Sequence, residues 1–204
     1  MAEPQEERSL SLDDCLKLLK GERDEQRLAG LLLVTKFCRN DDFGSLKKVY
    51  EAVGSHFLDR LLRTGSGENC DVYLRLSVTV LAAFCRVPEI ASSADMVSRI
   101  SLVLEIMSKG RPAANTLEEC YEVLYLVSSA CGAGVMALVN SGGLRVMAPQ
   151  MSDLPDGSHA MEVAIKILQL LVRKLSSESM IIELSLVVAA VARQFAVLHN
   201  ALKF

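Results

Sequence analysis

Arginines recur at polar positions in the second helical segment of each predicted repeat, and their chemistry is the most specific in the chain. A planar guanidinium group donates two parallel hydrogen bonds to a carboxylate or a phosphate. Side chains of this type along one face would form a groove for acidic or phosphorylated segments of a protein partner. The alternative is that they are the solvated ends of amphipathic helices. The candidate partner-binding residues are Arg60, Arg63, Arg99, Arg145 and Arg193.

Cysteine and histidine, the usual metal ligands and nucleophiles, do not occur at the spacing that such chemistry needs. The six cysteines form no CxxC pair, and His56, His159 and His199 each lie at the boundary of a predicted helix. Zinc sites need closely spaced ligands, whereas cysteines within apolar helical patterns are typical of small buried side chains in a reducing compartment. The sequence therefore predicts no metal and no cofactor.

Sequence motifs of enzymes are also missing. The chain contains no GxGxxG, GxxxxGK[ST], HExxH or GxSxG pattern. Gly132-Ala133-Gly134 and Gly142-Gly143 look like fragments of a phosphate loop, but they follow helical segments and not strands. We interpret them as turns between helices, and we expect a protein without catalytic activity.

The elements that carry these residues show a repeat. Long apolar helical stretches begin at Leu28, Leu74, Leu117 and Ala160, so their starts lie 43 to 46 residues apart. Helical recurrence at this interval is typical of HEAT and armadillo repeats, in which each helix pair buries its apolar face only against its neighbours. The sequence therefore predicts an all-α fold, a right-handed α-solenoid of about four helix-pair repeats with a short N-terminal helix.

Composition and charge agree with a helical protein rich in Leu, Val and Ala. Half of the residues are hydrophobic, only 5% are aromatic, and Trp is absent. The net charge of −3 is unlike the basic surface of a nucleic-acid-binding protein, so no nucleic-acid partner is expected. The acidic N-terminus lacks the apolar core of a signal peptide, and the apolar run Leu184–Ala192 is too short to span a bilayer. We therefore expect a cytoplasmic protein.

Helix boundaries are predicted from caps, glycines and prolines. Residues 1–8 are expected to be disordered, and the helical repeat region is expected to cover residues 9–204. Ser11 is expected to cap the first short helix, and Asn115 or Thr116 to cap the helix that ends near Cys131. A turn is expected over residues 88–93, and the remaining helices over residues 24–39, 43–53, 56–64, 74–86, 95–109, 135–140, 144–151, 158–175 and 178–195.

The last two predicted helices are apolar almost all round, which indicates that they are covered on several sides. Arrays of helical repeats need a polar terminal repeat for solubility, and none is recognisable here. We therefore expect the chain to be the N-terminal part of a longer array or a shortened product of one. Its C-terminal face is expected to self-associate or to be covered by further repeats. The residues expected to be exposed on this face are Leu184, Val187, Val188 and Val191.

Three segments resemble the opening of the neurochondrin family. They are LAGLLLVTKFCRNDD from Leu28, VYEAVGSHFLDRLLRTG from Val49 and LRLSVTVLAAFCRVPEIA from Leu74, in the family's order and at similar spacing. The match is specific through about residue 109 and weaker beyond, where ALVNSGGLRVMAPQM from Ala137 resembles an armadillo-type turn. The Gly65-Ser66-Gly67 loop departs from the vertebrate pattern, as in a distant or plant-type member.

The resemblance implies an all-helical, cytoplasmic adaptor that binds protein partners along a helical-repeat face and has no enzymatic activity. Vertebrate members are associated with neurite outgrowth and with the regulation of a calmodulin-dependent kinase and of membrane receptors, so a role in signalling is implied. The family offers no catalytic motif to transfer. The alternative is an adaptor that associates peripherally with membranes, although the chain shows no lipidation signal and no basic amphipathic helix.

Overall fold

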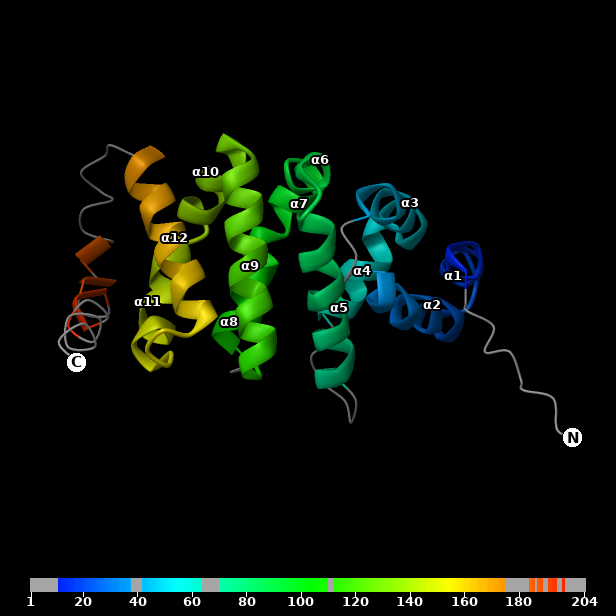
Figure 1. Ribbon diagram of the computed structural model, residues 1–204, viewed down its shortest axis with the longest axis horizontal. Helices are drawn as coiled ribbons and strands as arrows, with labels where there is room; N and C mark the ends of the chain where they lie inside the picture. Colours follow the sequence, from blue (N-terminus) through cyan, green and yellow to red (C-terminus); the bar gives the residue numbers. More distant parts are fainter. Residues whose placement is uncertain are drawn as a thin grey trace, which may run out of the picture.

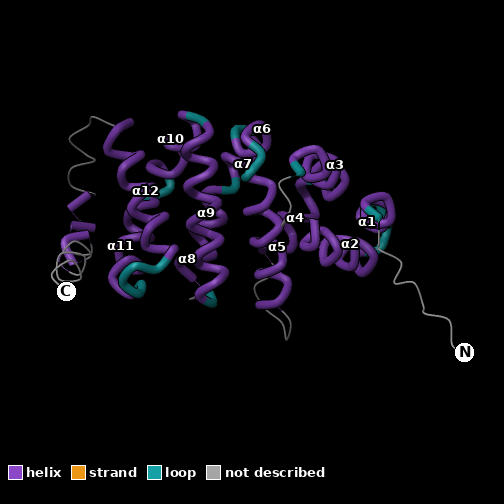
Figure 2. The backbone as a smooth tube through the Cα atoms, in the orientation of Figure 1, coloured by secondary structure: helices purple, strands orange, loops and turns teal. Residues whose placement is uncertain are grey.

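The computed structural model describes residues 11–37, 42–63, 70–109 and 112–174, and single positions between residues 184 and 196. Within these ranges the chain consists of helices and short connections, without any strand (Figure 2). The all-α prediction is therefore confirmed. The N-terminus that was expected to be disordered and the Gly65-Ser66-Gly67 loop lie outside the described residues.

Twelve helices follow one another along the described chain (Figure 1). The helix predicted over residues 43–53 has these bounds, and most of the other helices agree with the prediction within a few residues. The bounds are α1 Leu12–Leu19, α2 Asp24–Phe37, α3 Phe43–Val53, α4 Ser55–Arg63, α5 Cys70–Cys85, α6 Pro88–Ala91, α7 Ala94–Ser98, α8 Ile100–Lys109, α9 Ala114–Ala130, α10 Gly132–Asn140, α11 Gly143–Asp153 and α12 His159–Lys174.

The repeating unit contains three helical segments, whereas the sequence predicted a helix pair. The units are α3–α4–α5, α6/α7–α8–α9 and α10–α11–α12, and α1 and α2 precede them. The last helix of each unit packs on the last helix of the next, so α2, α5, α9 and α12 form one layer (Figure 1). The first residues of these helices lie 44 to 46 residues apart. The unit has three helical segments and not the predicted two, because each long helix is preceded by short helices that turn the chain.

The remaining helices cover the other side of a continuous core. α4 packs on α8, and α8 packs on α11, so the second helices of the units lie side by side as expected. The short helices α3, α6, α7 and α10 lie along one edge (Figure 1). The buried apolar side chains form one cluster from Cys15 to Val187. Phe84 and Tyr121 are among its largest members, and burying a side chain such as Phe contributes about 1.5–3 kcal/mol.

The helix predicted over residues 95–109 is broken at Arg99. α7 ends at Ser98 because the Arg99 backbone N–H donates to the carbonyls of Met96 and Val97 and closes a tight turn. α8 then begins at Ile100. Residues 88–91 form one helical turn, α6, where a non-helical turn was expected. Proline at the first helical position suits this start, since the backbone N–H that it lacks has no partner there.

The predicted helix caps are correct at Ser11 and wrong at α9. The Ser11 hydroxyl accepts a hydrogen bond from the Asp14 N–H, and the Asp14 carboxylate accepts one from the Ser11 N–H, which is a capping box. α9 begins after Ala113, whose side chain makes no capping hydrogen bond. Thr116, one of the expected caps, lies within α9 and is buried. Its side chain faces the core and is therefore not available to cap the helix.

α10 begins at Gly132 and not at Val135, as the sequence predicted. Cys131 is the N-cap residue, and its Sγ accepts a hydrogen bond from the Gly134 N–H at 3.4 Å. Gly134 lies so close to α9 that an added Cβ would stand 2.4 Å from the Val127 carbonyl oxygen. The glycine therefore permits a tight corner between α9 and α10, where a separate loop was expected.

Candidate interaction surfaces

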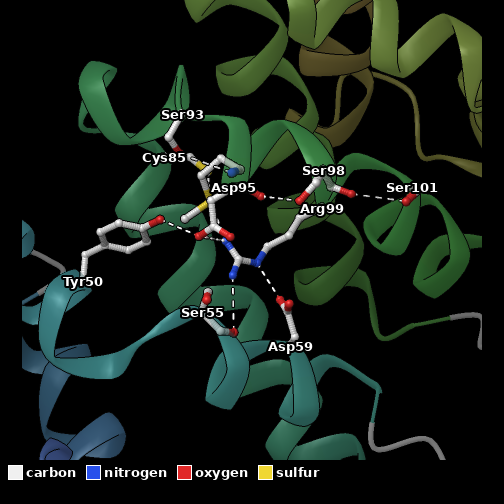
Figure 3. A network of polar contacts seen from close by, with 10 residues as sticks. Tyr50, Ser55, Asp59, Cys85, Ser93, Asp95, Ser98, Arg99 and Ser101 are labelled. Atoms are coloured by element: carbon white, nitrogen blue, oxygen red, sulfur yellow. Dashed lines mark hydrogen bonds and ion pairs between the residues drawn. The ribbon is translucent and has the colours of Figure 1, made fainter.

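Arg99 lies inside the protein, between α4, α7 and α8 (Figure 3). Its side chain is only 3% exposed. Nε donates to Asp59 and Nη1 to Asp95, both at 2.7 Å, and Nη2 donates to the Ser55 carbonyl at 3.3 Å. The expected place of Arg99 on an exposed polar face is therefore wrong. A guanidinium group that is buried and bonded in this way does not reach a partner at the surface.

The Arg99 network joins helices of two successive units. The Tyr50 hydroxyl, on α3, donates to Asp95 at 2.6 Å (Figure 3). Burial opposes the charge of Asp95, but the hydrogen bonds from Tyr50 and Arg99 outweigh it and hold the pKa of the carboxyl below its ordinary value. Burial also opposes the charge of Arg99, yet its two carboxylate partners, Asp59 and Asp95, raise its pKa. Arg99 is thus a structural residue that links α3 and α4 to α7 and α8.

Arg193 also makes its contacts within the protein. Nη1 donates to the Ser152 carbonyl at 2.6 Å, and Nη2 donates to the carbonyls of Met151 and Leu154 at 3.3 and 3.4 Å. Nε lies 3.5 Å from the Asp156 carboxylate. The last carbonyls of a helix have no partner inside that helix. Arg193 therefore caps the C-terminal end of α11, a contact that the sequence did not predict.

Arg60, Arg63 and Arg145 are exposed, but they do not form one continuous ladder. Arg60 and Arg63 line a pocket beside α4, whereas Arg145 lines a separate pocket of about 480 Å³ beside α8, α9 and α11. Arg60 pairs with Asp24 of α2 at 2.7 Å. The structure therefore brings together only two of the five candidate arginines at the surface. Partner binding at Arg60, Arg63 and Arg145 stays a prediction.

Polar side chains cross from α5 to α9 on the outer surface of the long-helix layer. The Thr79 hydroxyl, on α5, lies 2.8 and 2.9 Å from the two carboxylate oxygens of Glu119, on α9. Arg86 Nε donates to Glu122 at 3.1 Å. Burial raises the pKa of the Glu119 carboxyl, the Thr79 hydrogen bond opposes this rise, and the nearby charge of Glu122 adds to it. These contacts join two successive units through side chains that remain partly open to solvent.

The same surface continues onto α12. Nε2 of His159 lies 4.0 Å from Glu118 of α9, and Lys166 pairs with Glu162 at 2.7 Å. The sequence contained one signal of this surface, the spacing of Glu118 and Glu122, which places two carboxylates on one face of a helix. We call this surface the polar strip. Its members are Arg75, Thr79, Arg86, Glu118, Glu119, Glu122, Tyr125, His159, Glu162 and Lys166.

An apolar groove of about 600 Å³ lies between α12 and described positions that follow it. Val188 is 60% exposed there, as the sequence predicted. Val187 is only 3% exposed, because it packs on the apolar core, and Leu184 and Val191 are partly buried against the same core. The prediction of an exposed C-terminal face is therefore correct for Val188 and wrong for Val187. Self-association through this face stays a prediction.

The described cysteines are free thiols that differ in burial. Burial raises the pKa of Cys85 and of Cys120 to about 12, whereas Cys131, at the corner between α9 and α10, is partly exposed. A thiolate is the form that reacts with alkylating agents. Iodoacetamide is therefore expected to modify Cys131 in the native protein and to leave Cys85 and Cys120 unmodified until urea is added. Peptide mapping by mass spectrometry tests this, and native labelling of Cys120 at the rate of Cys131 would contradict it.

The other candidate ligands are dispersed. His56 lines the pocket beside α4, His159 belongs to the polar strip, and His199 lies outside the described residues. In the described part of the chain, no group of three His, Cys, Asp or Glu side chains is arranged to hold a metal ion. None of the described helices is both long and apolar enough to cross a membrane.

Comparison with known proteins relates this architecture to one family. The neurochondrin family model matches residues 6–204. The neurochondrin homolog of Drosophila melanogaster is 29% identical over 172 residues, which are 78% of this chain and 23% of the fly protein. Neurochondrin of Gallus gallus is 32% identical over 127 residues, 57% of this chain and 18% of that protein. Neurochondrin of Homo sapiens is 31% identical over 121 residues, 54% of this chain and 17% of that protein.

The match extends over all of the described helical units. The chain spans about a fifth of the length of the curated relatives that it matches. No solved structure matches it. The family model includes the segments from Leu28, Val49 and Leu74 that carry the resemblance, so the prediction made from those segments is confirmed. The chain belongs to the neurochondrin family.

Proposed function

We propose that this chain is a non-enzymatic scaffold that binds protein partners along one face of its helical repeats. A unit of three helices that recurs every 44 to 46 residues supports a right-handed α-solenoid of the armadillo/HEAT type. Proteins of this architecture stack their repeats into extended binding surfaces. As the family resemblance implies, the proposal includes a cytoplasmic location and a regulatory role in signalling.

The polar strip is the observation that carries the proposal. Its side chains come from α5, α9 and α12, so a partner that lies across it contacts three successive units. The helices that carry the strip, α5, α9 and α12, are packed on the core through fully buried side chains such as Leu81, Leu124 and Ile167. Side chains on a rigid support lose less conformational freedom on binding, which favours affinity.

The strip presents charges of both signs in a fixed order. Arg75 lies on α5, Glu118 and Glu122 lie on α9, and Lys166 lies on α12. A protein segment with the complementary order of charges would form charge-assisted hydrogen bonds along the strip. Tyr125, partly buried on α9, supplies an aromatic side chain of the type that anchors interfaces. The carboxylates of α9 would repel a nucleic-acid backbone, which favours a protein partner.

Charge reversal on the strip tests the proposal. The variant Glu118→Lys/Glu162→Lys changes two exposed or partly exposed carboxylates of α9 and α12 into cations. Like charges placed opposite each other across an interface cost several kcal/mol. We therefore expect at least a roughly tenfold loss of the proteins that the chain captures from a lysate of the source cells. Helicity measured by far-UV circular dichroism is expected to be unchanged.

The matched control is Glu51→Lys/Glu89→Lys. It makes the same charge change at exposed positions on α3 and α6, on the edge formed by the short helices. The control is expected to capture the same proteins as the unchanged chain, as identified by mass spectrometry. If the strip variant also captures that set undiminished, the polar strip is not the binding face and the proposal fails.

A further inference from the structure

A pocket between α2 and α4 gathers three arginines on a protein whose net charge is −3. Its volume is about 440 Å³. Its lining residues are Arg27 from α2 and His56, Phe57, Asp59, Arg60 and Arg63 from α4. His56, Arg60 and Arg63 follow one another at one-turn spacing, so they lie on one face of α4. We propose that this pocket binds the phosphate group of a phosphorylated serine or threonine in a segment of a protein partner.

Arg27 is held in place by the protein itself. Its Nη2 donates to the Val53 carbonyl at 2.6 Å, and its guanidinium carbon lies 4.0 Å from the centre of the Phe57 ring. Its Nε is buried and has no hydrogen-bond partner among the described residues. The hydrogen bond to Val53 and the packing on Phe57 already fix the Arg27 guanidinium group, so an anionic oxygen that binds it loses less free energy to ordering.

The carboxylates beside the pocket are already engaged. Asp59 accepts a hydrogen bond from the buried Arg99 at 2.7 Å, so its charge is offset from within the protein. Asp24 pairs with Arg60 at 2.7 Å, but the two side chains are 55% and 61% exposed. Ion pairs at exposed positions are weak. The doubly charged phosphate group is a stronger hydrogen-bond acceptor for the guanidinium group of Arg60 than the carboxylate of Asp24 is. The pocket therefore has positive charge available for an incoming anion.

The surroundings favour a phosphorylated segment over other anionic ligands. Phe57 is only 2% exposed, so its ring offers no free face on which a nucleobase would stack. The exposed acids Asp24 and Glu25 lie in the first turn of α2, and Glu105 is close enough to Arg63 for their charges to interact. A broad anionic membrane surface would meet these acids as well as the arginines. A peptide segment that carries a single phosphate group is small enough to reach the arginines without lying against these acids.

The inference deepens the proposed scaffold function and rests on it, because it names the chemistry of one partner segment. The probe is an acetylated Gly-Gly-phosphoserine-Gly-Gly amide, titrated into the whole chain and followed by NMR chemical shifts. We expect it to bind at least about tenfold more tightly than the same peptide without phosphate, since charge-assisted hydrogen bonds to the guanidinium groups are lost without it. Equal affinity for the two peptides would overturn the inference.

Paired variants locate the binding site. Arg60→Gln/Arg63→Gln removes the two exposed guanidinium groups of the pocket and is expected to weaken phosphopeptide binding by about tenfold or more. Arg173→Gln removes an exposed arginine in the last turn of α12, outside the pocket, and is expected to leave binding unchanged. Equal losses in both variants would contradict a specific pocket. Circular dichroism and urea unfolding establish that each variant is folded.

Two further results separate this inference from its rivals. Sedimentation with phosphatidylserine vesicles, without any response to the phosphopeptide, would overturn it in favour of a membrane surface. If the phosphopeptide does not bind while the Glu118→Lys/Glu162→Lys variant still loses its captured partners, only the pocket is refuted. If the strip variant keeps its partners while the phosphopeptide binds, the polar strip fails and the pocket stands, since the titration needs no cellular partner.

Discussion

Replacing Arg99 with alanine is expected to lower the free energy of unfolding by about 3 kcal/mol. Removal of one member of a buried ion pair usually costs about 3–5 kcal/mol, because the remaining charges lose their partner. The side chains of Asp59 and Asp95 are 35% and 37% exposed, so water replaces part of the lost interaction and the lower end of the range applies. Urea unfolding followed by far-UV circular dichroism measures the change.

The matched control for this prediction is Arg86→Ala. Arg86 forms a comparable pair with Glu122 at 3.1 Å, but its side chain is 44% exposed. Exposed ion pairs contribute about 0–1 kcal/mol, so the control is expected to unfold close to the unchanged protein. Equal losses for Arg99→Ala and Arg86→Ala would show that burial of Arg99 does not decide the cost.

The pH dependence of the free energy of unfolding, measured for the unchanged protein and for Arg99→Ala, gives a second measure of the Arg99 network. The pKa of Asp95 is lowered in the folded state despite its burial, through Tyr50 and Arg99. A carboxyl with a lowered folded pKa stabilises the protein above its unfolded pKa, about 3.9 for Asp, and this contribution is lost as the pH falls through the folded value. The stabilities of the unchanged protein and Arg99→Ala are therefore expected to converge in acid. A constant difference down to acid unfolding would contradict the role of the Asp95 charge.

Gly134→Ala is expected to lower the free energy of unfolding by about 2–3 kcal/mol, because overfilling a packed interior has costs of this size. The added Cβ would stand 2.4 Å from the Val127 carbonyl oxygen, and that oxygen belongs to the backbone of α9. A backbone atom cannot turn aside as the end of a side chain can. The corner between α9 and α10 must therefore open, which disturbs the packing of the second unit on the third. Urea unfolding measures the loss.

Gly132→Ala provides the control within the same helix. A Cβ on Gly132 would meet no atom within 4 Å, and alanine favours helix over glycine by up to about 1 kcal/mol. The control is therefore expected to be neutral or slightly stabilising. If both alanine variants lose the same stability, the cause is a change in the first turn of α10 and not the close approach of Gly134 to α9.

Features that depend on neighbouring residues in the sequence were predictable. The apolar stretches from Leu74 and Ala160 gave the interval of the repeat, because each long helix has to bury an apolar face. Ser11 and Asp14, three residues apart, gave the first cap, since a capping box is complete within one helical turn. The neurochondrin resemblance rested on contiguous segments in the same way.

Features that depend on packing between units were not predictable. Arg99 is at a polar position of a helical pattern, and only the approach of Asp59, forty residues earlier, makes it an interior residue. Arg193 lies at the end of α11 because it donates hydrogen bonds to backbone carbonyls about forty residues earlier in the chain. The polar strip likewise depends on which residues of α5 and α9 face each other. Local sequence fixes the helices, whereas the contacts between units fix which polar side chains remain at the surface.

Carboxyl footprinting tests the central claim, that partners bind across α5, α9 and α12. The chain is treated with a carbodiimide and an amine label, alone and bound to a captured partner, and each labelled carboxyl is quantified by mass spectrometry. We expect the partner to protect Glu118, Glu122 and Glu162, while Glu51 and Glu89 on the short-helix edge are labelled as before. Protection of Glu51 and Glu89 with unchanged labelling of the strip would contradict it.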